Sequence, residues 1–197
     1  MTDSPLMPVY APSPANFVRG EGARLFDASG RSWLDFIAGI AVNGLGHCHP
    51  ALVAALKAQS EKLWHVSNLY QTDLQRSLAQ RYVDATFADV VYFSNSGTEA
   101  VETALKVARR FHATNGAPER IDIIGFEGAF HGRTYGAINA AGNPNYLDGF
   151  GPRLPGYVRL GWGDHEALKA EVASPSEAAV SGDRVQGEGG VRGIRGR

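Results

Sequence analysis

A turn of small and hydroxyl-bearing residues, Ser94 to Glu99, stands between an apolar run and a long helical pattern. The first amides of a helix lack partners within the helix, and the aligned peptide dipoles add a partial positive charge there. The turn suits a phosphate group, because Ser96 and Thr98 carry hydroxyl donors and Gly97 lets an anion approach the backbone. Ser96 and Glu99 also have the spacing of a capping box. From these residues alone, a phosphate site and a well-capped helix are equally good interpretations.

A second candidate site is the segment Phe130-His131-Gly132-Arg133, in the glycine-rich stretch after an apolar run at residues 121–126. The aromatic ring of Phe130 could stack on a flat cofactor ring. The guanidinium of Arg133 could bind a carboxylate through two parallel hydrogen bonds. In isolation, a core phenylalanine and a solvated arginine are the commoner interpretations of the same residues.

The elements that would position these side chains follow from the apolar pattern. The run at 90–93 predicts a buried strand, 100–111 predicts a helix, and 121–126 predicts a second strand. Strand, helix and strand at this spacing form a βαβ unit, so we expect an α/β fold around a mostly parallel sheet. A ligand at the carboxyl end of such a sheet would lie close to both candidate segments.

The N-terminal part of the chain predicts a different arrangement. Four prolines within residues 1–18 indicate an extended arm. Apolar pairs at 25–26 and 33–34, separated by a polar turn with a glycine, predict a β-hairpin. Helices are expected from Pro50 to about Leu63 and again from Thr72, where Gln75 completes a capping box.

Composition and charge exclude several classes of protein. The 197 residues carry a formal net charge of -1, which gives no reason to expect nucleic acid or an anionic membrane as a partner. No apolar run is long enough to span a membrane, and one cysteine excludes an intrachain disulfide, so we expect a cytoplasmic protein. His47, Cys48 and His49 could ligate a metal, but in an extended segment Cys48 points away from both histidines, so no metal site is predicted.

Taken together, these segments resemble the class III (ornithine-type) aminotransferases, which use pyridoxal 5'-phosphate. The resemblance is carried in family order by seven segments: 39–42, 44–50, 63–68, 95–100, 129–133, 149–152 and 185–191. Within the family, the sequence is most similar to the acetylornithine branch, because Phe130 and Arg133 occur together. The resemblance implies a partial fold type I large domain, mostly parallel sheet with helices on both faces. It places an N-terminal arm and small-domain segment at 1–66, the cofactor-binding large domain at 67–191 and an aberrant Gly/Arg tail at 192–197.

The resemblance also implies roles for the candidate residues. Gly97 and Thr98, with Ser96 beside them, would hold the cofactor phosphate, and Phe130 would stack on its ring. Arg133 would bind the carboxylate of the amino donor or of the 2-oxo acid acceptor. The reaction implied is N-acetylornithine plus 2-oxoglutarate to N-acetylglutamate semialdehyde plus glutamate, a step of arginine biosynthesis in a homodimer. Succinylornithine, ornithine and 4-aminobutyrate are the alternative amino donors.

The sequence departs from the family in length and in its lysines. Family members are roughly twice as long, so the chain is expected to be truncated after about half of the family length. None of Lys57, Lys62, Lys106 and Lys169 matches the family's Schiff-base lysine, so no catalytic residue is predicted. The implied consequences are a chain that is inactive alone and, as an alternative function, a non-catalytic remnant or pseudo-subunit. The glycine- and arginine-rich end further indicates a frameshift or a decayed gene.

Overall fold

The structure is a computed structural model that describes residues 5–183, 185–186 and 192–193. The chain divides between Leu78 and Ala79 into two compact units. The predicted domain limit at residues 66 and 67 stays a prediction. The glycine- and arginine-rich tail at 192–197 lies outside the described residues except for Arg192 and Gly193.

The first unit is built on the predicted hairpin. Strands β1 (Phe17–Glu21), β2 (Arg24–Asp27) and β3 (Ser32–Leu34) form an antiparallel sheet in that order. The turn after β2 is closed by Asp27, whose Oδ1 accepts from the Ser29 and Arg31 amides and whose Oδ2 accepts from Trp33 Nε1 at 2.8 Å. Hydrogen bonds from Ser29 and Trp33 lower the pKa of Asp27 to about 2. At neutral pH the turn is therefore held by an ionised carboxylate.

Two predicted helices follow. Helix α1 (Pro50–Ser60) begins with proline in its first turn, as the sequence indicated. Helix α2 (Asp73–Ala85) begins after Thr72, whose Oγ1 accepts from the Gln75 amide at 3.4 Å. Helix α3 (Gly97–Thr114) has 18 residues and begins three residues before the predicted start. No helix in the described part of the chain is both long and apolar enough to cross a bilayer.

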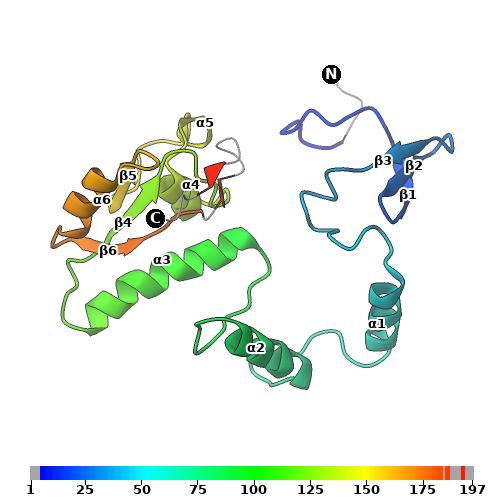
Figure 1. The fold of residues 1–197 in the computed structure, drawn as a ribbon, viewed down its shortest axis with the longest axis horizontal. Coiled ribbons are helices and arrows are strands. Elements are labelled where there is room, and N and C mark those ends of the chain that lie inside the picture. The colour runs from blue at the N-terminus through cyan, green and yellow to red at the C-terminus, as the bar shows by residue number, and fades with distance from the viewer. Residues whose placement is uncertain (1–4, 184, 187–191, 194–197) are drawn as a thin grey trace. The chain divides into compact units, whose positions relative to one another are not determined.

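The second unit contains the expected parallel sheet (Figure 1). Its strands are β4 (Asp122–Phe126), β5 (Tyr157–Leu160) and β6 (Glu177–Val180), in the order β5-β4-β6 and all parallel. The helices joining them are α4 (Tyr135–Ala141), α5 (Pro144–Leu147) and α6 (His165–Val172). A further short antiparallel pair consists of β7 (Val185–Gln186) and β8 (Arg192–Gly193).

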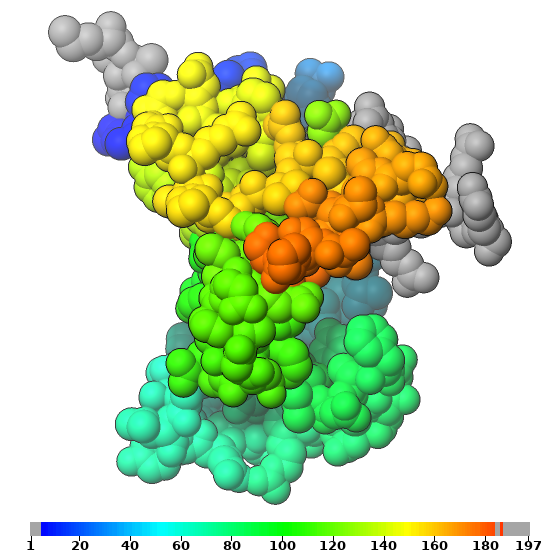
Figure 2. All heavy atoms as spheres, turned by 90° about the vertical axis from the view of Figure 1, so that its left-hand side faces the viewer, coloured from blue at the N-terminus to red at the C-terminus, as the bar shows by residue number. Residues whose placement is uncertain are grey.

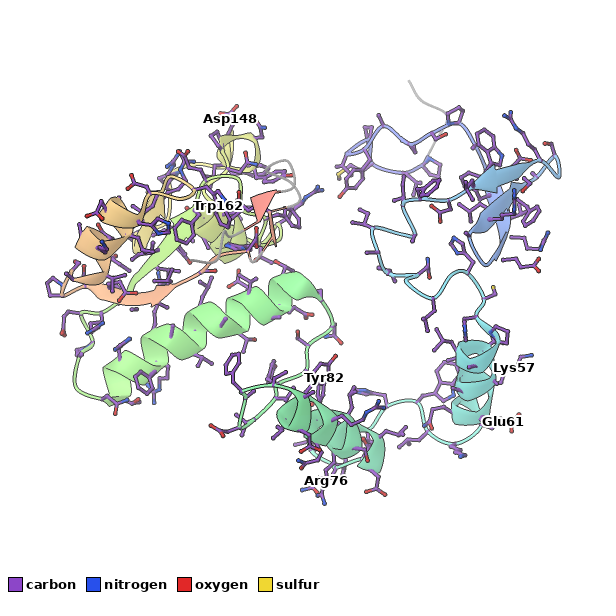
Figure 3. The ribbon with its side chains drawn as sticks, in the orientation of Figure 1. Lys57, Glu61, Arg76, Tyr82, Asp148 and Trp162 are labelled. Atoms are coloured by element: carbon purple, nitrogen blue, oxygen red, sulfur yellow. The ribbon has the colours of Figure 1, made fainter. Side chains whose placement is uncertain are left out.

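The core of this unit lies between the sheet and helices α3 and α4. Leu105 of α3, Ile123 of β4 and Ala140 of α4 are buried together, with Ala108 and Tyr157 packed around them. Figure 2 shows α3 in green beside the yellow and orange segment that carries α5, β5 and α6. Trp162, labelled in Figure 3, lies edge-on to Phe126 at the end of β4, with ring centroids 5.8 Å apart. Because β4 is central, its carboxyl end is fixed by neighbours on both sides.

The strand predicted at residues 90–93 is wrong for this structure. The segment belongs to no strand, and Val90 and Tyr92 are 84% and 67% exposed. A strand is stabilised by hydrogen bonds to a neighbouring strand, and the described residues provide no such neighbour at this position. The apolar composition of the run is that of a buried strand, but composition does not supply the partner.

Candidate functional site

The N-terminus of α3 is capped as its sequence indicated. Ser96 is the N-cap residue, and its Oγ accepts from the Glu99 amide at 3.3 Å and lies 3.0 Å from Glu99 Oε2. Hydrogen bonds from Asn95 and from Ser96 hold the pKa of Glu99 below its ordinary value. Both interpretations of this turn therefore begin from a capped helix, and the decisive question is what the remaining amides of the first turn bind.

Two amides of the first turn are left open. Within the described residues, the backbone N–H groups of Gly97 and Thr98 donate no hydrogen bond, whereas the next two amides bind Ser96. A Cβ atom added at Gly97 would meet nothing within 4 Å. The end of an 18-residue helix thus presents two donors and open space, the arrangement that suits an anion.

The loop after β4 passes directly against this helix end. Gly132 adopts a φ of 105°, and a Cβ atom there would overlap Oγ1 and Cβ of Thr98. An L-residue with a side chain is disfavoured at this φ, and the approach leaves no room for one. The glycine therefore brings together the two segments that the sequence singled out separately.

A chain of side-chain hydrogen bonds crosses the same contact. Thr98 Oγ1 lies 3.1 Å from Thr134 Oγ1, and Thr134 Oγ1 donates to Glu102 Oε1 at 2.5 Å. Thr98 and Glu102 are one turn apart on α3, so both side chains lie on the same helix face. Thr134 is the residue after Arg133. These hydrogen bonds therefore connect the start of α3 to the segment that carries the arginine.

Tyr146 of α5 contacts both of the other candidate residues. Its ring lies 6.0 Å from the Phe130 ring at an interplanar angle of 71°, an edge-to-face geometry. The Arg133 guanidinium carbon lies 5.4 Å from the centroid of the same tyrosine ring. Phe130 remains 38% exposed. Tyr146 thus holds an aromatic side chain and a cation in fixed relation, close to the helix end that offers the amides.

The arrangement can bind a ligand with three chemical parts. The open amides suit a phosphate, the Phe130 ring suits an aromatic system, and the Arg133 guanidinium suits a carboxylate. The structure brings Thr98 next to the Phe130–Arg133 loop and joins Phe130 to Arg133 through Tyr146. What these residues bind stays a prediction.

Sequence reasoning missed three residues of this arrangement. Glu102 could have been found, because it stands four residues after Thr98 in a helical pattern. Thr134 and Tyr146 gave no signal of their own, since each acts through a contact made by the fold. Of the three candidate metal ligands, His47 is bound to a carboxylate: its Nε2 lies 2.7 Å from Asp35 Oδ2, and this hydrogen bond is the main cause that lowers the pKa of Asp35.

Comparison with known proteins shows the family of this chain. The model of the family "Aminotransferase class-III" matches residues 7–194. Acetylornithine aminotransferase 2 of Caulobacter vibrioides is 62% identical over 189 residues, which are 96% of this chain and 47% of that protein. The solved N-acetylornithine aminotransferase of Stenotrophomonas maltophilia K279a has a TM-score of 0.78 at 37% identity. The match covers 93% of this chain and 45% of that protein.

A third relative carries the cofactor that the resemblance implies. Ornithine aminotransferase of Toxoplasma gondii, with pyridoxal 5'-phosphate at partial occupancy in its active site, has a TM-score of 0.88 at 32% identity. It covers 95% of this chain, and the chain covers 44% of it. The chain therefore spans about half the length of the relatives it matches. By the family match over nearly all of its residues, this chain belongs to the class III aminotransferases.

Proposed function

We propose that these residues form the phosphate-, ring- and carboxylate-binding part of a pyridoxal-phosphate aminotransferase of the acetylornithine type. The observation that carries the proposal is the contact of Gly132 with Thr98, which joins the open end of α3 to the loop that bears Phe130 and Arg133. The amino donor is N-acetylornithine and the acceptor is 2-oxoglutarate, since the relative at 62% identity bears the name acetylornithine aminotransferase 2. The reaction belongs to arginine biosynthesis in the cytoplasm.

The residues present fit the cofactor. A phosphate group seated at the start of α3 would accept from the Gly97 and Thr98 amides, with Ser96 holding the first turn in shape. Phe130 would lie against the pyridine ring, and the Tyr146 contact would fix the plane of the phenyl group.

The chemistry is divided between the cofactor and the protein. When bound, the cofactor supplies the electron sink that amino-group transfer requires. The helix end anchors the phosphate, Phe130 sets the orientation of the ring, and Arg133 holds the carboxylate of the donor or acceptor by two hydrogen bonds. Holding the substrate carboxylate at a fixed distance from the ring is the larger part of this contribution, because misplacement by about 1 Å can cost about 100-fold in rate.

The positions of the lysines favour a second candidate for the 197 residues by themselves, a cofactor-binding subunit that does not catalyse transfer. Lys106 is exposed on α3, on the order of 12 Å along the helix from Thr98. Lys169 pairs with Glu166 on α6, and Lys57, labelled in Figure 3, lies on α1 of the other unit. Lys62 follows α1. We therefore expect the 197-residue chain to bind the cofactor without the covalent attachment that transfer needs, and full activity to require a dimer with a complete homologue.

Binding of pyridoxamine 5'-phosphate tests the proposal, because this form of the cofactor needs no lysine for its attachment. Calorimetric titration of the chain should show one saturable site that inorganic phosphate competes for. Gly97→Ala should weaken binding about tenfold while the helix content stays the same, since its methyl group would meet no protein atom and would occupy the space of the phosphate. Absence of saturable binding, or binding indifferent to Gly97→Ala, would refute the phosphate assignment.

A second titration separates the two candidate functions. The chain is loaded with pyridoxal 5'-phosphate, N-acetylornithine is added, and glutamate formation from 2-oxoglutarate is measured. We expect no turnover from the chain alone, and none when the added full-length homologue carries an inactivated lysine. Turnover should appear when the homologue keeps its lysine. Turnover by the chain alone would show that one of its four lysines is functional, and comparison with ornithine and 4-aminobutyrate would then rank the donors.

Tyr146→Leu should weaken the binding of pyridoxamine 5'-phosphate two- to tenfold. An edge-to-face aromatic pair contributes about 0.5–1.5 kcal/mol beyond buried area, and the leucine side chain cannot replace it. Tyr146→Phe is the matched control, because it keeps the ring against Phe130 and removes the hydroxyl alone. Equal loss of affinity in both variants would assign the effect to the hydroxyl group and contradict the role of the ring.

A further inference from the structure

Asp183 lies against the backbone that carries Phe130. Its Oδ2 accepts from the Phe130 N–H at 3.0 Å, and its Oδ1 lies 3.6 Å from His131 Nδ1. On the other side of the same imidazole, Nε2 lies 3.3 Å from Ser181 Oγ. One carboxylate therefore faces two successive residues of the candidate site.

The sheet explains why these distant segments meet. Strands β4 and β6 are parallel neighbours, with Ile124 paired to Val180, so the segments that follow them leave the sheet at the same edge. The Ser181 amide extends the pairing by donating to the Ile124 carbonyl at 2.7 Å. Two residues later, Asp183 stands beside the loop that β4 feeds.

The histidine is enclosed in this contact. His131 is 7% exposed, and polar atoms of Ser181 and Asp183 face its two ring nitrogens. The residue before Phe130 is fixed as well, since Ala129 is fully buried and its amide donates to the Phe126 carbonyl at 3.2 Å. Phe130 is thus held from both flanks and through its own amide, while its ring remains partly exposed.

We propose that Asp183, together with His131, is a positioning pair that sets the height and orientation of the Phe130 ring over the cofactor. The consequence for the cofactor rests on the proposed function, in which Phe130 stacks on the ring. The fixing of the Phe130 backbone does not depend on it. Loss of the carboxylate frees the Phe130 amide and removes the group facing the buried imidazole, so the loop gains freedom at the residue that must lie flat against a ligand.

In space, Ser181, His131 and Asp183 follow one another as serine, histidine and aspartate do in a hydrolase triad. The geometry nevertheless favours a positioning role. The 3.6 Å separation of His131 Nδ1 and Asp183 Oδ1 exceeds a hydrogen bond. The other carboxylate oxygen is already bound to the Phe130 amide. Burial of the imidazole leaves little room for a substrate beside Ser181.

Amide hydrogen exchange tests the pair without any ligand. In the 197-residue chain followed by NMR, Asp183→Ala should speed exchange at Phe130 at least tenfold, while the buried β4 amides of Ile123 and Ile124 keep their rates. Asp183→Asn should give a smaller increase, because its amide oxygen can still accept from Phe130. Unchanged exchange at Phe130 in both variants would overturn the proposal. If Asp183→Ala also speeds amide exchange in β4, the Asp183→Asn variant decides. Faster exchange at Phe130 with unchanged β4 rates supports the proposal, and unchanged exchange at Phe130 overturns it.

A double-mutant cycle tests the consequence for the cofactor. Asp183→Ala should weaken the binding of pyridoxamine 5'-phosphate about tenfold in the wild-type background and no more than about twofold in the Phe130→Ala background, because the ring to be positioned is then absent. Equal losses in both backgrounds would overturn the positioning role. If the wild-type chain does not bind pyridoxamine 5'-phosphate, the proposed function fails, and the exchange rates still decide whether Asp183 holds Phe130.

Discussion

Gly132→Ala should lower the affinity for pyridoxamine 5'-phosphate by more than tenfold, the largest loss expected from one methyl group in this site. Its φ of 105° is unfavourable for alanine, and the new Cβ would overlap the side chain of Thr98. Either the loop moves away from α3 or Thr98 turns out of place. Both changes separate the helix end from Phe130 and Arg133. The site then cannot contact all parts of the ligand at the same time.

Gly163→Ala is the matched control for this substitution. Gly163 has a φ of 87°, so alanine pays a similar conformational cost there, but its Cβ would meet nothing within 4 Å. Calorimetric titration of both variants separates the two contributions. If Gly163→Ala loses as much affinity as Gly132→Ala, the cost lies in the backbone conformation, and the contact with Thr98 is not what joins the site.

Gly125→Ala should destabilise the second unit by about 2 kcal/mol or more, within the upper range expected for overpacking a core. Gly125 is buried in the central strand β4, and a Cβ atom there would overlap the carbonyl oxygen of Ala140 in α4. A backbone oxygen of a helix cannot turn aside as a side chain can. The helix must shift away from the sheet, which opens the cluster of Leu105, Ile123 and Ala140.

Denaturant unfolding measures this effect, with the midpoint for the second unit followed by Trp162 fluorescence in chains in which Trp33 and Trp64 are replaced by phenylalanine. Gly161→Ala is the control, because Gly161 follows β5 and its Cβ would meet only Asp164 Cβ at 3.9 Å, an ordinary contact. We expect the Gly161→Ala midpoint to stay close to that of the wild type. A Gly125→Ala midpoint equally close to wild type would mean that α4 is not tightly packed on β4.

Local signals in the sequence predicted the elements well where the hydrogen-bond partners are only a few residues apart in the sequence. The Asp27 turn is closed by its own neighbours, and the α3 cap needs only Ser96 and Glu99, so both were predictable. A parallel sheet around residues 121–126 was predicted, but the neighbours of β4 in that sheet, β5 and β6, were not. The segment at 90–93 failed because a strand requires a neighbour that a local pattern does not contain.

The site shows the same division. Ser96, Gly97 and Thr98 were predicted from helix-end chemistry, and Phe130 and Arg133 from residue type and resemblance. Tyr146 and Asp183 could not be found in this way, because their importance lies in contacts across 13 to 53 positions of sequence, as for Asp183 with Phe130. The contacts of Asp183 with Phe130 and His131 appear only once β4 and β6 are paired.

In the hydrogen-bond chain at Thr98, a bound phosphate and Thr134 would compete for the hydroxyl proton of Thr98. A carboxylate accepts but does not donate, so Thr134 gives its proton to Glu102, and Thr98 must give its own to Thr134. A phosphate that recruits the Thr98 hydroxyl takes that proton away from Thr134. Thr134 is then held by Glu102 alone, one residue from Arg133. If the site binds as proposed, occupation of the phosphate end would be communicated to Arg133 through the loss of a single hydrogen bond.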